Sequence, residues 1–311
     1  MTYENFISVL TEKLQAKMEN DTQIKIHKIL KNNHVQLDGL AFHNSNNQAS
    51  PTIYINDYFI QYEEGDSIEI IVQEIYSLYE NNKDTLHFDI EFIKDFNNIK
   101  QRIAYKIINY DSNPELLENI PHKKFLDLAI VYYLILGKDI AGNMTTLIQN
   151  QHLDFWNVDI HTIHKLSEYN TPLLLPYTIR DMEDVLKELL LEDMKNEEAV
   201  PLIKETPDTS NPMYVLTNDI GINGAACMLY DDILSEAAKK IGSDLIILPS
   251  SIHEVLLVPR DSEISLKEFV EMVSDINETT VEPEDRLSNQ VYLYSLENNS
   301  ITPASADSMK A

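Results

Sequence analysis

The stretch from Met213 to Pro259 constrains the fold of this chain more than any other. It contains two pairs of short apolar segments, at residues 213–217 and 225–230 and at 245–248 and 252–258. Segments of this length joined by polar turns are typical of paired strands, and the helical pattern between the two pairs ends at Gly242, a common helix terminator. A further helix is expected at 266–276 and a closing strand at 290–295. The C-terminal unit is therefore predicted as β-β-α-β-β-α-β.

The residues before this unit also alternate between helical and strand patterns. Helices are expected from spacings of three and four residues, and strands from alternating or continuously apolar runs. The expected helices cover residues 3–14, 68–78, 92–99, 159–170 and 182–190, and the expected strands cover 23–30, 35–42, 102–109, 125–136 and 143–149. Together with the C-terminal unit this predicts an α+β protein with mixed helices and mainly antiparallel sheets.

Composition shifts suggest where the chain divides. A segment with three prolines and no periodicity separates an acidic helix from the C-terminal unit, and such segments are typical of linkers. The last residues lack enough apolar side chains to pack. The expected parts are an N-terminal α+β region (1–196), a linker (197–212), the C-terminal unit (213–296) and a disordered tail (297–311).

Net charge and missing motifs exclude several classes of function. The formal net charge is −27, and basic side chains are needed to neutralise phosphates, so direct binding to nucleic acid or to an anionic membrane is not expected. The glycine-rich loops of dinucleotide-binding and P-loop proteins are missing, and no cofactor is expected. One cysteine, no apolar run long enough for a membrane span and no signal-peptide pattern favour a cytoplasmic protein.

Several segments spread along the chain resemble one bacterial family. These are Ser50–Tyr54, Phe125–Val131, Asn170–Pro172, Met213–Asn218, Gly224–Cys227 and Leu248–Glu254. The resemblance covers nearly the whole chain, and it is to the family called domain of unknown function 5688. It implies a bacterial protein without a known activity, and no catalytic residue can be carried over from it.

The polar insertion after Leu248 is the main candidate binding site. Ser250, Ser251, His253 and Glu254 interrupt two apolar strands, and strand alternation would place the last two of these side chains on opposite faces. A structural interpretation is also open, in which the proline and serines form a tight turn and His253 or Glu254 bonds its backbone. The functional interpretation makes the four residues a recognition surface.

A catalytic interpretation of the same region requires a nucleophile. Cys227, or one of Ser250 and Ser251, could be activated by His253, with Glu254 as a further candidate catalytic residue. A lone cysteine among small apolar residues is more often a buried hydrophobe, and no nucleophile-elbow motif surrounds the serines.

Metal-ligand spacing occurs once, in the helix that Asp159 is expected to cap. His161, His164 and Glu168 lie three and four residues apart, so they share one side of a helix. A complete ligand set is missing from this spacing, and a native metal ion is not expected.

These observations favour a non-enzymatic binding or regulatory protein that recognises a protein or a small ligand through the turn at 249–254. One alternative is a hydrolase that uses Cys227, Ser250 or Ser251 with His253. Another is an acidic decoy that mimics nucleic acid for a basic partner protein.

Overall fold

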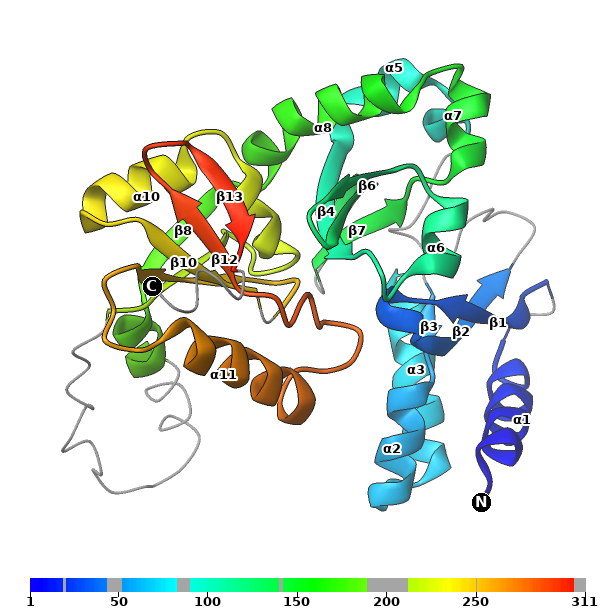
Figure 1. Cartoon of the computed structure of the whole chain (residues 1–311). Helices are drawn as coiled ribbons and strands as arrows, with labels where there is room; N and C mark the ends of the chain where they lie inside the picture. Colours follow the sequence, from blue (N-terminus) through cyan, green and yellow to red (C-terminus); the bar gives the residue numbers. More distant parts are fainter. Residues whose placement is uncertain are drawn as a thin grey trace. The chain divides into compact units, whose positions relative to one another are not determined.

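The computed structural model describes residues 1–18, 21–43, 52–82, 90–139, 142–188, 212–249 and 251–304. The chain divides into two compact units, residues 1–99 and 100–311 (Figure 1). This division differs from the expected boundary at residue 196, and all of the expected linker except Pro212 lies outside the described residues. None of the helices in the described ranges combines the length and the apolarity that a bilayer crossing requires.

The first unit packs helices against a small antiparallel sheet. Its elements are α1 (Tyr3–Gln15), β1 (Gln23–Leu30), the 3₁₀ turn η1 (Asn32–His34), β2 (Gln36–His43), β3 (Ile53–Tyr54), α2 (Asn56–Glu64), α3 (Ile68–Asn82), α4 (Ile90–Lys94) and α5 (Phe96–Ile99). The predicted hairpin is confirmed, since β1 and β2 pair in one register from Gln23 opposite His43 to Leu30 opposite Gln36. Phe6 and Leu10 of α1 meet Ile71 of α3 in its core.

The second unit begins with a sheet covered by a long helix. The elements are η2 (Lys100–Arg102), β4 (Ile103–Asn109), α6 (Pro114–Asn119), β5 (His122–Phe125), β6 (Leu128–Asp139), β7 (Gly142–Leu147), α7 (Asn150–Trp156) and α8 (Ile160–Leu174). β6 pairs with β4 along one side and with β5 and β7 along the other. The expected single strand at 125–136 is corrected to two, because Leu126 adopts a left-handed conformation with φ of 55° and turns the chain.

Helix α8 is longer than the sequence suggests, and its C-terminal half closes the edge of β4. The prediction that it begins at Asp159 is confirmed, since the Asp159 carboxylate accepts a hydrogen bond from the Thr162 amide. The expected end near residue 170 is wrong, because the helix continues through Pro172 to Leu174. The Asn170 amide donates to the Ile103 carbonyl oxygen, and the Thr171 hydroxyl accepts from the Tyr105 amide. These contacts to β4 hold the last turn in place where proline removes a helical hydrogen bond.

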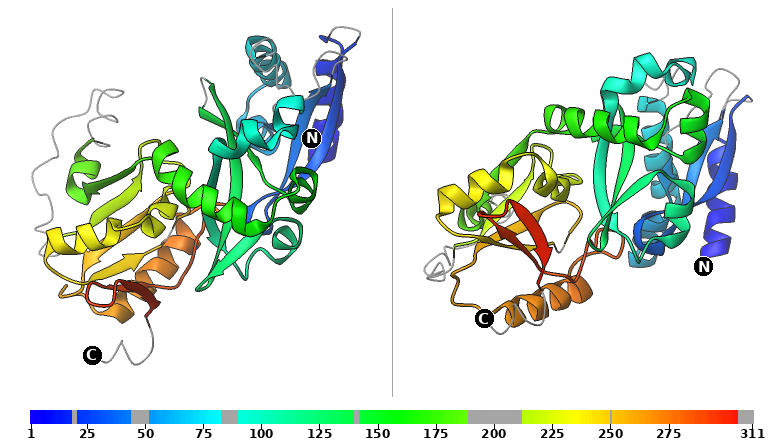
Figure 2. Two further views of the ribbon diagram at one scale, coloured as in Figure 1. Left: turned by 90° about the horizontal axis from the view of Figure 1, so that it is seen from above. Right: turned by 45° about the horizontal axis from the view of Figure 1, so that its top comes forward.

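A second, larger sheet completes this unit. Its elements are β8 (Tyr177–Asp181), a helix at 182–188, β9 (Tyr214–Asn218), the 3₁₀ helix η3 (Gly224–Leu229), α10 (Ile233–Ile241), β10 (Leu245–Leu248), β11 (Val255–Pro259), α11 (Leu266–Thr279), β12 (Tyr292–Ser295) and β13 (Ser300–Pro303). Among the described strands the order is β13-β12-β10-β11-β9-β8, and every pairing is antiparallel. Phe269 and Val273 of α11 pack on Ile246 and Val258 of one face. Figures 1 and 2 show α10 on the opposite side of the sheet.

The α+β class with mainly antiparallel sheets is confirmed, while the order within the C-terminal unit needs two corrections. The expected strand at 225–230 is the 3₁₀ helix η3, which Asn223 introduces in a left-handed conformation. The expected disordered tail contains β13, which pairs with β12 through a turn at Asn299. A left-handed asparagine tolerates the tight turn that this hairpin needs. Residues 305–311 lie outside the described part of the chain.

Candidate functional site

The turn at 249–254 connects β10 to β11. Strand β11 begins at Val255, so the expectation of a strand from residue 252 is wrong at its start. His253 and Glu254 therefore precede the strand, and the alternation that would separate their side chains does not apply to them. Ser250 lies outside the described residues.

Neighbouring segments hold the backbone of this turn. The Ile252 amide donates to the Asp285 carbonyl oxygen over 2.8 Å, and the Ala225 amide donates to the Ile252 carbonyl oxygen over 3.2 Å. The Thr217 hydroxyl donates to the His253 carbonyl oxygen over 2.7 Å. These bonds come from both sides of the turn, so its backbone is fixed before any ligand arrives.

The His253 ring is held at both nitrogens. Its Nδ1 accepts a hydrogen bond from the Asn223 amide over 3.2 Å, and its Nε2 lies 3.1 Å from Asp285 Oδ1. The His253 and Asp285 side chains are 29% and 33% exposed. The structure thus brings a predicted site residue together with Asp285 and Asn223, which sequence reasoning missed because both lie about thirty residues away along the chain.

Ser251 and Glu254 complete the described part of the turn. Ser251 is buried, and its hydroxyl oxygen accepts from the His253 amide over 2.9 Å. Burial raises the pKa of the Glu254 carboxyl group, while the positive charge of His253 and a hydrogen bond from Ser251 act in the opposite direction. The four described polar side chains, including Asp285, therefore form one connected group.

Cys227 differs from an activated nucleophile. Its side chain is fully buried in η3, and burial raises the pKa of the thiol to about 12. A catalytic cysteine needs a lowered pKa and access to substrate. His253 already uses both ring nitrogens for Asn223 and Asp285, so this arrangement favours a structural role for Cys227.

The His253–Asp285 pair makes stability depend on pH. The hydrogen bond to Asp285 raises the pKa of His253, against the effect of burial. A raised pKa in the folded state gives stability that is fully present below the unfolded value near 6.5 and is lost as pH rises through the folded value. We expect His253→Gln to cost about 0.5–1 kcal/mol near pH 5.5, allowing for solvent screening, and less near pH 9. Urea unfolding at both pH values measures this, and Asp285→Asn should remove the same pH dependence. If the free energy of unfolding of both variants still changes between these two pH values as it does in the wild type, the pair is not the source of the pH dependence.

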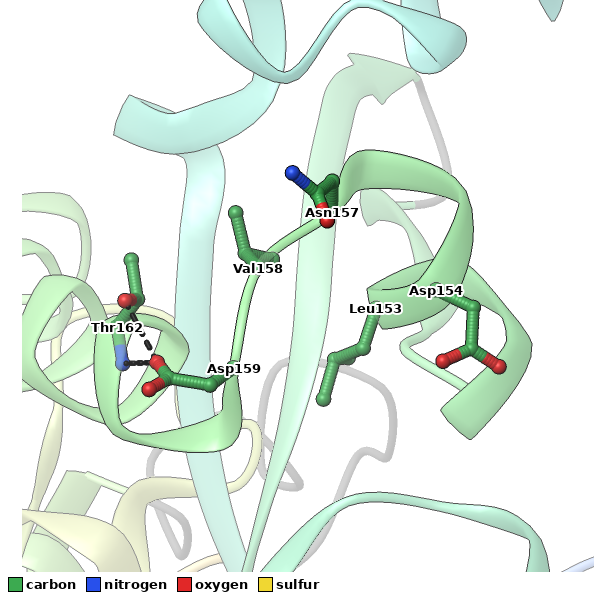
Figure 3. A pocket seen from close by; sticks show the side chains of 6 residues that line it. All are labelled: Leu153, Asp154, Asn157, Val158, Asp159 and Thr162. Carbon is green, nitrogen blue, oxygen red and sulfur yellow. Dashed lines mark hydrogen bonds between the residues drawn. The ribbon is translucent and has the colours of Figure 1, made fainter.

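A separate pocket of about 560 Å³ lies at the junction between the end of α7 and the start of α8 (Figure 3). It is lined by Leu153, Asp154, Asn157, Val158, Asp159 and Thr162. Asp159 turns toward Thr162, whose amide and hydroxyl donate to its Oδ1 over 2.8 and 2.7 Å, and these bonds lower the pKa of Asp159. One of the two carboxylates is therefore committed to capping α8. The pocket has the size of a small-molecule site, and its carboxylates suit a positively charged group.

The metal-spacing residues of α8 are only partly brought together. His164 Nε2 lies 3.1 Å from Glu168 Oε1, as the spacing of four residues predicts. Lys123 and Tyr132 also contact the His164 ring, so both ring nitrogens have protein partners. In the part of the chain that the structure describes, no group of three or more His, Cys, Asp and Glu side chains could hold a metal ion.

Comparison with known proteins gives a family and no activity. No curated protein and no solved structure matches the chain. The model of a family of unknown function, DUF5688, matches residues 3–296. Since that match spans nearly the full length, the chain belongs to the family of unknown function DUF5688.

Proposed function

We propose that this protein is a non-enzymatic binding or regulatory protein that recognises a protein or a small ligand through the turn at 249–254. The observation that carries the proposal is the state of His253. Its ring has a hydrogen-bond partner at each nitrogen, and the backbone of its turn is bonded to neighbouring segments on both sides. The side chain nevertheless remains 29% exposed beside Asp285. A side chain that is already held in place loses little conformational entropy when a ligand binds, which raises affinity.

The turn is a better recognition surface than the pocket at α7 and α8. Asp159 of the pocket is occupied in capping a helix, whereas the carboxyl groups of Glu254 and Asp285 lie beside His253. Lys106 of β4 adds a positive charge close enough to influence the His253 pKa. A ligand would therefore meet groups of both signs, a combination that provides specificity more than strong attraction.

The test uses three forms of the protein as bait in native extract. These are the wild type, His253→Ala/Glu254→Ala, and a control, Lys267→Ala/Glu271→Ala, which removes an exposed ion pair on α11. Bound proteins and metabolites are quantified by mass spectrometry. We expect a species that is enriched on the wild type and the control and is lost from the His253/Glu254 variant.

The species found in this way is then tested directly with purified components. Its affinity for the turn variant should fall at least about tenfold, because hot-spot residues cost more than about 1.4 kcal/mol when truncated. Circular dichroism establishes that each variant is folded. Equal recovery of every species on all three baits would contradict recognition by this turn.

A further inference from the structure

A polar cluster around His164 lies between α8 and the sheet of β4–β7, and it shares no residue with the turn. His164 is 9% exposed. Its Nδ1 lies 3.0 Å from the Tyr132 hydroxyl of β6. Its Nε2 lies 2.9 Å from Lys123 Nζ of β5 and 3.1 Å from Glu168 Oε1, one turn farther along α8. Strand β5 and helix α8 thus bring an ammonium group and a carboxylate to the same ring nitrogen.

Lys123 and Glu168 make opposite demands on that nitrogen. An ammonium group can only donate a hydrogen bond, and an ionised carboxylate can only accept one. Nε2 satisfies Lys123 when it carries a lone pair, and it satisfies Glu168 when it carries a proton. A single ring nitrogen cannot do both at once, so one of the two contacts is unfavourable in either state.

The other side of the ring can adapt to both states. The Tyr132 hydroxyl can donate to an unprotonated Nδ1 or accept from a protonated one. Burial lowers the pKa of His164, which favours a neutral ring with a single proton. The charge of Glu168 opposes this effect, while the charges of Lys123 and His161 reinforce it. The conflict is therefore confined to Nε2 and its two exposed partners.

The geometry suggests how a ligand would relieve the conflict. Lys123 is exposed, and the Glu168 side chain is 58% exposed, so both can swing outward from His164. The carboxylate of Glu168 already occupies the position in which an external carboxylate would accept from the protonated Nε2. A ligand in its place could take a second hydrogen bond from Lys123, which would then no longer point at the ring nitrogen.

We propose that Lys123 and His164 form a binding site for a small carboxylate ligand, and that Glu168 is the internal carboxylate that such a ligand displaces. The site offers two hydrogen-bond donors, Lys123 Nζ and the protonated Nε2 of His164, which β5 and α8 bring together beside β6. Glu168 can leave readily, because its side chain is 58% exposed and its carboxylate becomes hydrated while the ligand replaces its hydrogen bond to the ring. This site adds a ligand class to the protein and does not depend on the function proposed for the turn.

Acetate is the probe for this site, and imidazole nitrogen NMR is the readout. The His164 signals are assigned by their loss in His164→Gln. In the wild type, acetate should shift the Nε2 resonance of His164 to a plateau, and chloride at equal ionic strength should not. Glu168→Gln should bind acetate about two- to fivefold more tightly, because the internal competitor is gone.

Two further variants make the result specific. Lys123→Gln should bind acetate about tenfold more weakly, since it removes a charge-assisted hydrogen bond. Glu271→Gln on α11 removes a carboxylate from a comparable pair, Lys267 and Glu271, and should leave acetate affinity unchanged. The proposal is overturned if acetate gives no saturable shift in either the wild type or Glu168→Gln, or if Lys123→Gln binds as well as the wild type.

Discussion

Replacing Gly224 with alanine is expected to destabilise the protein by about 3 kcal/mol, the upper end of the usual cost of overpacking. A β-carbon at this position would lie 2.1 Å from Thr217 Oγ1, 2.5 Å from the His253 carbonyl oxygen and 2.7 Å from the Asn218 amide nitrogen. Two of these three neighbours are backbone atoms, which cannot rotate away. The added carbon would therefore push η3 from the turn at 249–254, so the loss of stability should be accompanied by a change at His253.

The matched control is Gly137→Ala. Gly137 lies in β6, and a β-carbon there would have no neighbour within 4 Å. This variant should unfold within about 0.5 kcal/mol of the wild type, as surface substitutions usually do. Urea unfolding measures both variants, and the His253 imidazole resonances report on the turn. Equal stability of Gly224→Ala and Gly137→Ala would show that η3 packs less closely against the turn than the structure indicates.

Asp127→Ala is expected to lower the free energy of unfolding by about 2–4 kcal/mol, because it removes two hydrogen bonds to a charged acceptor and leaves both donors without a partner. Asp127 follows the left-handed residue Leu126 between β5 and β6. Its Oδ2 accepts from the Ser288 hydroxyl over 2.6 Å, and its Oδ1 accepts from the Tyr292 hydroxyl over 2.8 Å. Tyr292 is fully buried, so its hydroxyl would have no access to solvent as a substitute.

A double-mutant cycle separates this interaction from other effects. Tyr292→Phe alone should cost less stability than Asp127→Ala. The two changes together should cost less than the sum of the single changes, because Tyr292→Phe removes a hydroxyl donor that Asp127→Ala would leave without an acceptor. Ser288→Ala provides the same comparison for the other oxygen. Unfolding energies that simply add would contradict a shared network. Since the Ser288 amide donates to the Pro249 carbonyl oxygen, the Asp127 variant should also loosen the turn.

The parts of the fold that were predicted correctly depend on interactions close in sequence. The hairpin of β1 and β2 follows from alternation within each strand and a short connection, and α10 ends at Gly242 as its pattern predicts. The parts that were missed depend on distant partners. Strands β8 and β13 lie at the two edges of their sheet, so their half-exposed side chains lack a strong apolar pattern. The apolar run at 225–230 resembles a strand, but Gly224 packs closely against Thr217 and His253, and the residues that follow form the 3₁₀ helix η3.

The candidate site shows the same division between local and distant interactions. The contact between His164 and Glu168 could be predicted, because four residues form about one helical turn. Lys123 could not be predicted as a neighbour, since it reaches His164 from another element. Asp285 was missed in the same way, since it reaches His253 from the segment between α11 and β12. The roles of these residues require the tertiary structure.

The side chains at the end of α8 have a consequence for how this chain behaves among its own copies. A strand at the margin of a sheet offers unpaired amides and carbonyls on which a second molecule can build. Asn170 and Thr171 occupy two such groups on β4, at Ile103 and Tyr105. The helix thus covers that margin of the sheet, and a second molecule cannot add a strand to β4 at these two positions even where salt screens the repulsion between negatively charged copies.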